Sequence, residues 1–203
     1  MYGKQKGFTL IEILVVVTII GVLAGLVVVL IPRGQEEQIK ISCISNVKGL
    51  NNLLTVSSGA QYPQYRGADL LICLVNKGDL QGDRSLRTLF CPGDNEETYE
   101  KAGGAEVYGK IDLTRKSAWG HLTSYAGRDQ LDGKCAAKKG GESAILLCDD
   151  SDDHHFKKGF VVGWTDGGAT YRSKADDWRI KFDQPVEIGE NSTIDELKCL
   201  RAD

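Results

Sequence analysis

Apolar residues are concentrated at the start of the chain, where FTLIEILVVVTIIGVLAGLVVVLI runs from Phe8 to Ile31. Glu12 is the single ionisable side chain in these 24 residues. At about 1.5 Å of rise per residue, a helix of this length is about 36 Å long, enough to cross a hydrocarbon core of about 30 Å. The pattern therefore predicts a transmembrane helix over residues 8–31.

An amphipathic pattern follows in QEEQIKISCISNVKGLNNLLTVS, from Gln35 to Ser57. It predicts that residues 35–58 form the outer half of one long helix, with an apolar stripe that packs against the rest of the protein. The stripe consists of Ile39, Cys43, Val47, Leu50 and Leu54. Between the two halves, Pro32 cannot donate a helical hydrogen bond, so a kink or melted turn is expected at residues 31–35.

Residues 59–203 have the pattern of an α+β head. Three short apolar runs, AILLCD (144–149), FVVGW (160–164) and ATYR (169–172), predict antiparallel strands, with a tight turn at residues 166–168. The run DLLICLVNK (69–77) fits a short helix or a buried strand, and TIDE (193–196) has capping-box spacing, which predicts one or two helical turns at 194–200. Glycines punctuate a loop-rich stretch at 78–120. The expected fold is a long helical spine carrying a small antiparallel sheet and loop-rich insertions.

Charge sets the expected orientation. Lys4 and Lys6 precede the apolar run, so residues 1–7 should stay in the cytoplasm and residues 33–203 should face outward, into the periplasm or the medium of a bacterium. A cleavable secretory signal fits poorly, because its apolar stretch is shorter and ends in small residues. A plain signal anchor remains the alternative. The formal charge is −3, which argues against nucleic acid as a partner.

The segment KGFTLIEILVVVTIIGVLAGL places basic residues before Gly7, then Phe8, and then Glu12 at the fifth position after the glycine. It resembles the signature of type IV prepilins and of type II secretion pseudopilins. The resemblance implies cleavage between Gly7 and Phe8 by a prepilin peptidase and N-methylation of the new Phe8 amine. A buried amine needs an anion, and Glu12, most simply that of the adjacent subunit, would supply it.

The same resemblance implies a pilin-like fold and a division into leader (1–7), assembly helix (8–31), outer spine helix (35–58) and head (59–203). It implies a non-enzymatic filament subunit, anchored once in the bacterial inner membrane with a periplasmic head and later extracted into a periplasmic or extracellular filament. The implied partners are other pilin or pseudopilin copies, the prepilin peptidase, the inner-membrane assembly platform and membrane lipid. The alternative is a membrane-anchored or filament-tip module that binds a carbohydrate or a metal.

Parts of the head resemble the prepilin-type proteins of planctomycete-like bacteria. These parts are FCPGD (90–94), TSY (123–125) and HHFKKGFVVGWTDGGATY (154–171). In that family nine residues separate a histidine from an Asp-Gly pair, whereas ten residues separate His155 from Asp166 here. The head as a whole also resembles the major pseudopilin of type II secretion.

Six cysteines occur without any CxxC pair: Cys43, Cys73, Cys91, Cys135, Cys148 and Cys199. Behind an export signal, an even number of cysteines is typical of disulfides, and we expect all six to be oxidised. Six cysteines allow 15 pairings, among which Cys135 with Cys148 is the first choice. A catalytic pair of Cys91 with His154 or His155 is disfavoured, because Cys91 precedes a proline and lies in no recognisable motif.

The run CDDSDDHH (148–155) gathers four carboxylates, those of Asp149, Asp150, Asp152 and Asp153. Such a density of oxygen ligands suits Ca²⁺, and some pseudopilins bind calcium, although the run lacks the spacing of an EF-hand loop. A solvated acidic loop is the plainer interpretation. The neighbouring His154 and His155 could instead take a transition metal. No cofactor is required by the predicted function.

Overall fold

The computed structural model describes residues 7–57, 59–94, 98–108, 111, 120–155, 157–181 and 183–202, without the side chains of residues 27–33 and 152. The chain divides into two compact units, residues 1–38 and 39–203. The predicted leader, residues 1–7, lies outside the described residues except for Gly7. The helix α1 (Leu10–Ser57) belongs to both units.

Helix α1 continues through Pro32 and Gly34. The melted turn expected at residues 31–35 is therefore wrong for this structure. Loss of the one hydrogen bond that Pro32 cannot donate leaves the bonds of the neighbouring turns in place, and these keep the helical path.

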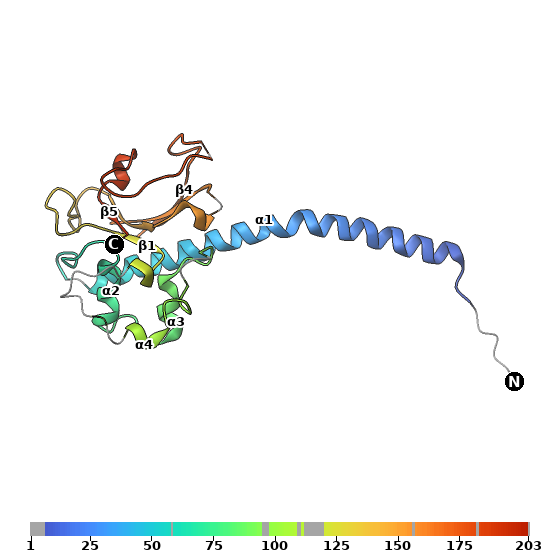
Figure 1. The fold of residues 1–203 in the computed structure, drawn as a ribbon, viewed down its shortest axis with the longest axis horizontal. Helices are drawn as coiled ribbons and strands as arrows, with labels where there is room; N and C mark the ends of the chain where they lie inside the picture. The colour runs from blue at the N-terminus through green and yellow to red at the C-terminus, as the bar shows by residue number, and fades with distance from the viewer. Residues whose placement is uncertain are drawn as a thin grey trace. The chain divides into compact units, whose positions relative to one another are not determined.

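The head holds a five-stranded antiparallel sheet in the order β4-β3-β2-β1-β5. Figure 1 labels β1, β4 and β5 within the head. Its strands are β1 (Tyr125–Arg128), β2 (Ile145–Asp149), β3 (Gly159–Trp164), β4 (Ala169–Ser173) and β5 (Leu200–Arg201). The three strands predicted from the sequence are β2, β3 and β4. The predicted turn joins β3 to β4: Gly167 has a φ of 90°, and the Gly168 amide donates to the Asp166 carboxylate at 2.8 Å.

The apolar stripe of α1 packs on one face of this sheet. Cys43, Val47, Leu50 and Leu54 are buried there, as predicted. The contact is so close at β3 that a Cβ on Gly163 would lie 2.8 Å from the Val47 side chain. A smaller cluster, including Phe160 and Leu200, covers the opposite face, which explains why every residue of β2 is buried.

Short helices complete the head. They are α2 (Asp69–Asn76), α3 (Asp83–Leu86), α4 (Ala105–Tyr108) and the 3₁₀ turns η1 (Arg87–Leu89), η2 (Gly120–Leu122), η3 (Asp152–His155) and η4 (Asp195–Leu197). The ambiguous run at 69–77 is thus a helix, α2. At the C-terminus the predicted helix is the single turn η4, which begins after Ile194 without a side-chain cap, so the expected capping box is not formed.

Candidate functional site

The start of α1 is organised by Thr9 and Glu12. The backbone amide and the hydroxyl of Thr9 both donate to Glu12 Oε2, at 2.7 and 2.8 Å. The Glu12 amide in turn contacts the Thr9 hydroxyl oxygen at 3.3 Å. This reciprocal pattern is a capping box, which satisfies amides that have no partner inside the helix. Thr-x-x-Glu is visible in the sequence, so this role of Glu12 could have been predicted there and was missed.

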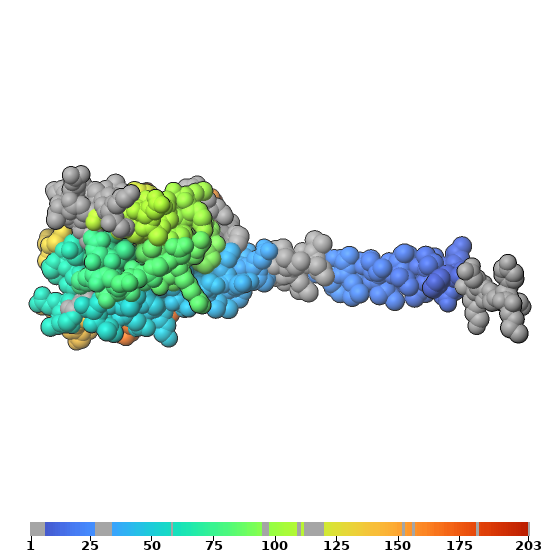
Figure 2. All heavy atoms as spheres, turned by 90° about the horizontal axis from the view of Figure 1, so that it is seen from below, coloured from blue at the N-terminus to red at the C-terminus, as the bar shows by residue number. Residues whose placement is uncertain are grey.

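The apolar side chains that follow are exposed within their own unit. Phe8 and Leu10 each expose 84% of their surface. The same holds, at 48% or more, for Ile11, Ile13, Leu14, Val15, Val16, Val17, Ile19, Ile20, Val22, Leu23 and Leu26. Figure 2 draws the atoms of this segment as spheres, in blue. These side chains are positioned to contact lipid or another protein.

The predicted membrane segment 8–31 is described only in part, because the side chains of residues 27–31 are among those left out. Within the described portion of the chain, no helix combines the length and the hydropathy that a membrane span requires.

A second polar centre lies inside the head, around the carboxylate of Asp149 at the end of β2. Asp149 is fully buried. Its Oδ1 accepts a hydrogen bond from Cys43 Sγ at 3.1 Å, and its Oδ2 lies 3.1 Å from His155 Nε2 and accepts a further bond from the Val161 amide. The hydroxyl of Tyr125 lies 3.4 Å from Cys43 Sγ.

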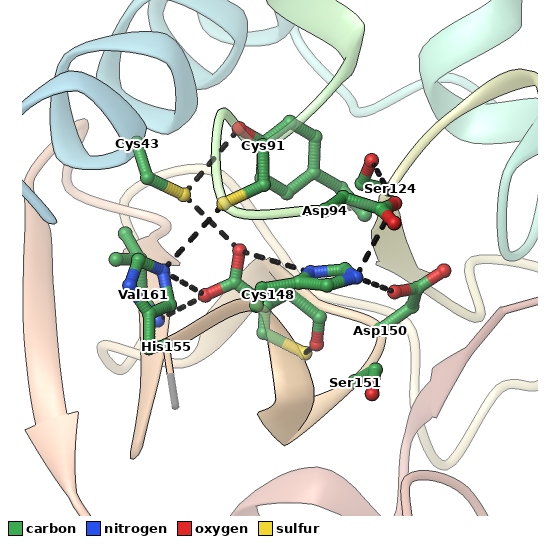
Figure 3. A network of polar contacts seen from close by, with 12 residues as sticks. Cys43, Cys91, Asp94, Ser124, Cys148, Asp150, Ser151, His155 and Val161 are labelled. Carbon is green, nitrogen blue, oxygen red and sulfur yellow. Dashed lines mark hydrogen bonds and ion pairs between the residues drawn. The ribbon is translucent and has the colours of Figure 1, made fainter. Parts of the chain in front are cut away.

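His154 extends this centre on its other side. Its Nε2 lies 3.3 Å from Asp94 Oδ2 and 3.4 Å from Asp150 Oδ1, and its Nδ1 lies 3.9 Å from Asp149 Oδ1. Asp94 also accepts a hydrogen bond from the Ser124 hydroxyl at 2.7 Å. Figure 3 shows how these contacts continue from Cys43 and Cys91 to Asp94 and Asp150.

Four groups in this centre could hold a metal ion: Cys43, Cys91, Asp149 and His155, whose donor atoms all lie within 4.8 Å of one another. Cys91 Sγ lies 3.7 Å from His155 Nε2. In Figure 3 the side chains of Cys43, Cys91 and His155 point toward a common centre. All four residues are buried.

The pKa values describe a charge-compensated cluster. Burial opposes ionisation of Asp149, but the adjacent imidazoles of His154 and His155 outweigh it and lower the pKa of Asp149 to about 2. Burial lowers the pKa of each histidine, yet contact with Asp149 raises both to about 9. The hydrogen bond with Cys43 lowers the pKa of Cys91 to about 6, with a contribution from His155, and burial raises the pKa of Cys43. Near neutral pH the carboxylate of Asp149 thus faces two cationic imidazoles, and His154 also faces the carboxylates of Asp94 and Asp150.

A close approach of two loops brings Cys91 to this centre. Cys91 follows η1 and precedes Pro92 and Gly93, and the backbone at Gly93 touches η3. A Cβ on Gly93 would lie 1.9 Å from the carbonyl oxygen of His154. Only glycine leaves room for this approach, which holds Cys91 beside His155.

The structure describes three of the four carboxylates of the predicted calcium loop, and these three face different surroundings. Asp149 points into the head, whereas Asp153 is exposed and pairs with Lys157 at 3.5 Å. Asp150 faces His154, and the side chain of Asp152 lies outside the description. The reason is that Asp149 still belongs to β2, whereas Asp153 lies in η3.

The cysteines also differ from the prediction. Cys135 pairs with Cys199, so the expected pairing of Cys135 with Cys148 is wrong. Cys148 instead lies in the second apolar cluster of the sheet. Cys43, Cys73, Cys91 and Cys148 are buried free thiols, so the expectation that all six cysteines are oxidised is also contradicted.

Comparison with known proteins finds a family match for the N-terminal region. Residues 2–28 match the model of the prokaryotic N-terminal methylation motif. This is a prepilin-type segment. Its match includes Gly7, Phe8 and Glu12, the residues for which processing and assembly roles are predicted.

Two curated proteins are similar to part of the chain, and both are named type II secretion system core protein G. The protein of Escherichia coli strain K12 is 49% identical over 51 residues, which is 25% of this chain and 35% of that protein. The protein of Dickeya chrysanthemi is 38% identical over 65 residues, or 31% and 42%. The chain thus covers less than half the length of these relatives. No solved structure matches it.

These findings show a prepilin-type N-terminal segment and a partial similarity to core protein G of type II secretion, in a chain whose head is α+β. Neither relative is named as an enzyme, and the predicted role of this chain is not enzymatic. Cys91 and His155, which are 64 residues apart, were considered in the sequence only as a disfavoured catalytic pair, and the structure places them in contact. The segments FCPGD, TSY and HH, noted above for their resemblance to prepilin-type proteins, all contribute residues to the buried centre.

Proposed function

We propose that this chain is a structural subunit of a type II secretion pseudopilus or a related type IV pilus-like filament. Prepilin peptidase would remove residues 1–7, the Phe8 amine would be methylated, and the mature chain would polymerise through residues 8–31. The match of residues 2–28 to the methylation motif carries this proposal, and the partial similarity to core protein G favours the secretion filament.

The exposed side chains of α1 explain why such a segment requires a partner. Thirteen large apolar side chains between Phe8 and Leu26 are exposed. Burial of each from water is worth about 1.5–3 kcal/mol, which together exceeds the about 4–15 kcal/mol that association costs. In this proposal, these side chains contact inner-membrane lipid before filament assembly and other subunits after it.

Transfer from lipid to a filament needs a different contribution, because lipid tails are as apolar as the helices. We assign this contribution to Glu12. Both hydrogen bonds from Thr9 go to Oε2, and the side chain is exposed, so it can approach the Phe8 amine of an adjacent subunit. A charge pair in apolar surroundings would fix the axial register of the subunits.

Location and partners follow from the same proposal. Before assembly the chain is anchored once in the inner membrane, with Lys4 and Lys6 in the cytoplasm and the head in the periplasm. The inner-membrane assembly platform then moves it into a filament with copies of itself or with other pseudopilins. The chemistry belongs to the peptidase and the platform, and the chain contributes surfaces.

Co-expression with a prepilin peptidase tests the proposal. Intact-mass and N-terminal analysis of membrane and filament fractions should give a chain that begins with methylated Phe8. The same expression without the peptidase is the control and should give the full chain. Retention of Met1 in assembled material, or a cut beyond Ile31, would overturn the proposal.

A further inference from the structure

Four donor groups from four separate segments meet inside the head. Cys43 comes from α1, Cys91 follows η1, Asp149 ends β2, and His155 lies in η3. We propose that these four residues bind one zinc-type divalent transition-metal ion in a closed structural site. The ion would link the outer part of the spine helix to the sheet and to two loops of the head.

The distances between the donor atoms fit a tetrahedral ion. Metal bonds of about 2.0–2.3 Å give edges of about 3.3–3.8 Å between donors. In the structure, Cys91 Sγ to His155 Nε2 is 3.7 Å, while Cys43 Sγ to Asp149 Oδ1 and His155 Nε2 to Asp149 Oδ2 are both 3.1 Å. The two Asp149 distances belong to different oxygens, and the separations between single donor atoms extend to as much as 4.8 Å, so side-chain shifts of up to about 1 Å would complete the tetrahedron.

The chemistry of the donors selects the metal. Two thiols and an imidazole are soft or borderline ligands, which favour zinc over calcium or magnesium. Calcium and magnesium require oxygen ligands, and only Asp149 supplies one here. The site therefore differs from the calcium loop expected at residues 149–153, with which it shares Asp149.

Burial of all four donors indicates a structural rather than a catalytic role. Catalytic zinc keeps a position open for water or substrate, whereas structural sites use four protein ligands. Binding would release the thiol proton of Cys43 and any proton still on Cys91 or on His155 Nε2, since metal ligands bind in their deprotonated forms. Tyr125, 3.4 Å from Cys43 Sγ, is placed to orient that ligand.

A disulfide between Cys43 and Cys91 is the main competitor, because their sulfur atoms lie within 4.8 Å. Such a bond would use the two sulfurs alone. It would give no role to the carboxylate of Asp149 and the Nε2 of His155, which face the same point. The convergence of all four groups favours the metal.

Cobalt and zinc titrations of the full chain in detergent test the site. After reduction with a reductant that spares the Cys135–Cys199 bond, and after removal of metals with a chelator, the chain should bind one ion. Cobalt should produce the intense near-ultraviolet absorption of thiolate ligation. One bound zinc should protect two of the four free thiols from a thiol reagent, and the chelator should restore their reactivity.

Ligand variants and matched controls distinguish this site from incidental binding. Cys91→Ser and His155→Gln should each weaken cobalt binding by more than about tenfold, since even the partners of metal ligands account for about 10–100-fold. Cys73→Ser and His121→Gln remove the same kinds of group elsewhere in the head and should leave affinity unchanged. Tyr125→Phe keeps all four ligands and should weaken binding by about tenfold.

Three results would overturn the proposal. The wild-type chain could bind no zinc or cobalt although its thiols are reduced. The control variants could lose binding as fully as the ligand variants. Mass analysis of the exported chain, without reduction, could instead show Cys43 and Cys91 joined by a disulfide. The first and third results do not depend on whether any variant folds.

Discussion

The two units of this chain treat apolar and charged side chains in opposite ways. In residues 8–26 the large apolar side chains are exposed, and Glu12, also exposed, bonds with its neighbour Thr9. Among the described residues of 39–203 most large apolar side chains are buried, with Ile41, Val56 and Leu131 as exposed exceptions, and a carboxylate, Asp149, is buried among histidines and thiols. The head thus buries most of its large apolar side chains within itself, whereas those of the N-terminal segment stay exposed.

The largest expected effect comes from breaking the buried centre. Asp149→Asn leaves His154 and His155 without their shared anion and should lower the free energy of unfolding of the head by about 3–5 kcal/mol. Asp153→Asn, on the exposed part of the same run, should change it by less than about 0.5 kcal/mol. Urea unfolding of the metal-free chain, followed by tryptophan fluorescence, measures both. Equal effects of the two variants would show that the buried carboxylate of Asp149 stabilises the head no more than the exposed carboxylate of Asp153.

The disulfide should rank next. Cys135 and Cys199 are 64 residues apart, and their bond restricts the unfolded chain. Replacing both cysteines by serine should destabilise the head by about 2–4 kcal/mol. Strong reducing conditions should destabilise the wild type similarly and have no further effect on the double variant. Peptide mapping that found Cys135 joined to Cys148 would contradict the pairing.

Stability of the metal-free head should fall as the pH rises in the Cys91→Ser variant, whereas in the wild type the lowered pKa of Cys91, about 6, acts in the opposite direction between pH 6 and pH 9. His154 and His155 have pKa values of about 9 in the folded chain, above the ordinary 6.5. Their contribution to the free energy of unfolding is therefore complete below pH 6.5 and is lost as the pH rises through 9. The loss is about 3 kcal/mol for one histidine. The two effects do not add, because both histidines share Asp149.

Unfolding of the Cys91→Ser variant, measured from pH 6 to pH 9.5 with a chelator present, would check this. His121→Gln, at an exposed histidine outside the centre, should leave the profile unchanged. A stability that stays flat across this range would show that the histidines are not held as cations by Asp149.

The smallest change in the free energy of helix formation, about 1 kcal/mol, is expected from variants of the cap at the start of α1. These variants should nevertheless have a large effect on filament assembly. Glu12→Ala removes both the capping box and the negative charge and should leave membrane insertion intact while filaments fail to form. Glu12→Gln keeps a capping side chain without the charge, and Thr9→Ala removes the cap and keeps the charge.

If the charge pairs with Phe8 of the neighbouring subunit, Glu12→Gln should fail to assemble and Thr9→Ala should assemble. The reverse outcome would show that Glu12 acts through the cap alone. Filament yield after shearing and electron microscopy give the readout. Normal yield from Glu12→Ala would remove both roles.

The sequence predicted those features that depend on local pattern. The stripe from Cys43 to Leu54 is buried in the head, and the strands β2, β3 and β4 lie where alternation and turn residues placed them. The strand β1 was missed because YAGR is short and contains glycine, and β5 has only two residues. Pairing with neighbouring strands, rather than propensity, makes these two segments strands.

The buried centre could not be predicted, because it depends on contacts over long separations. Asp149 and Cys43 are 106 residues apart, and Cys91 and His155 are 64 apart. Sequence alone grouped Asp149 with its acidic neighbours, which led to the calcium hypothesis. It likewise could not show that Cys148 and Asp149, adjacent in β2, face different clusters, so the pairing of Cys148 was wrong.

Gly93 lies where the loop that carries Cys91 comes into close contact with η3. An added methyl group there would overlap the carbonyl oxygen of His154, so the loop that carries Cys91 can accept it only by moving away from η3. Side chains of increasing size at position 93 would then move the thiol of Cys91 progressively farther from the imidazole of His155. The distance between the Cys91 thiol and the His155 imidazole could be increased stepwise in this way without removing any chemical group of the centre.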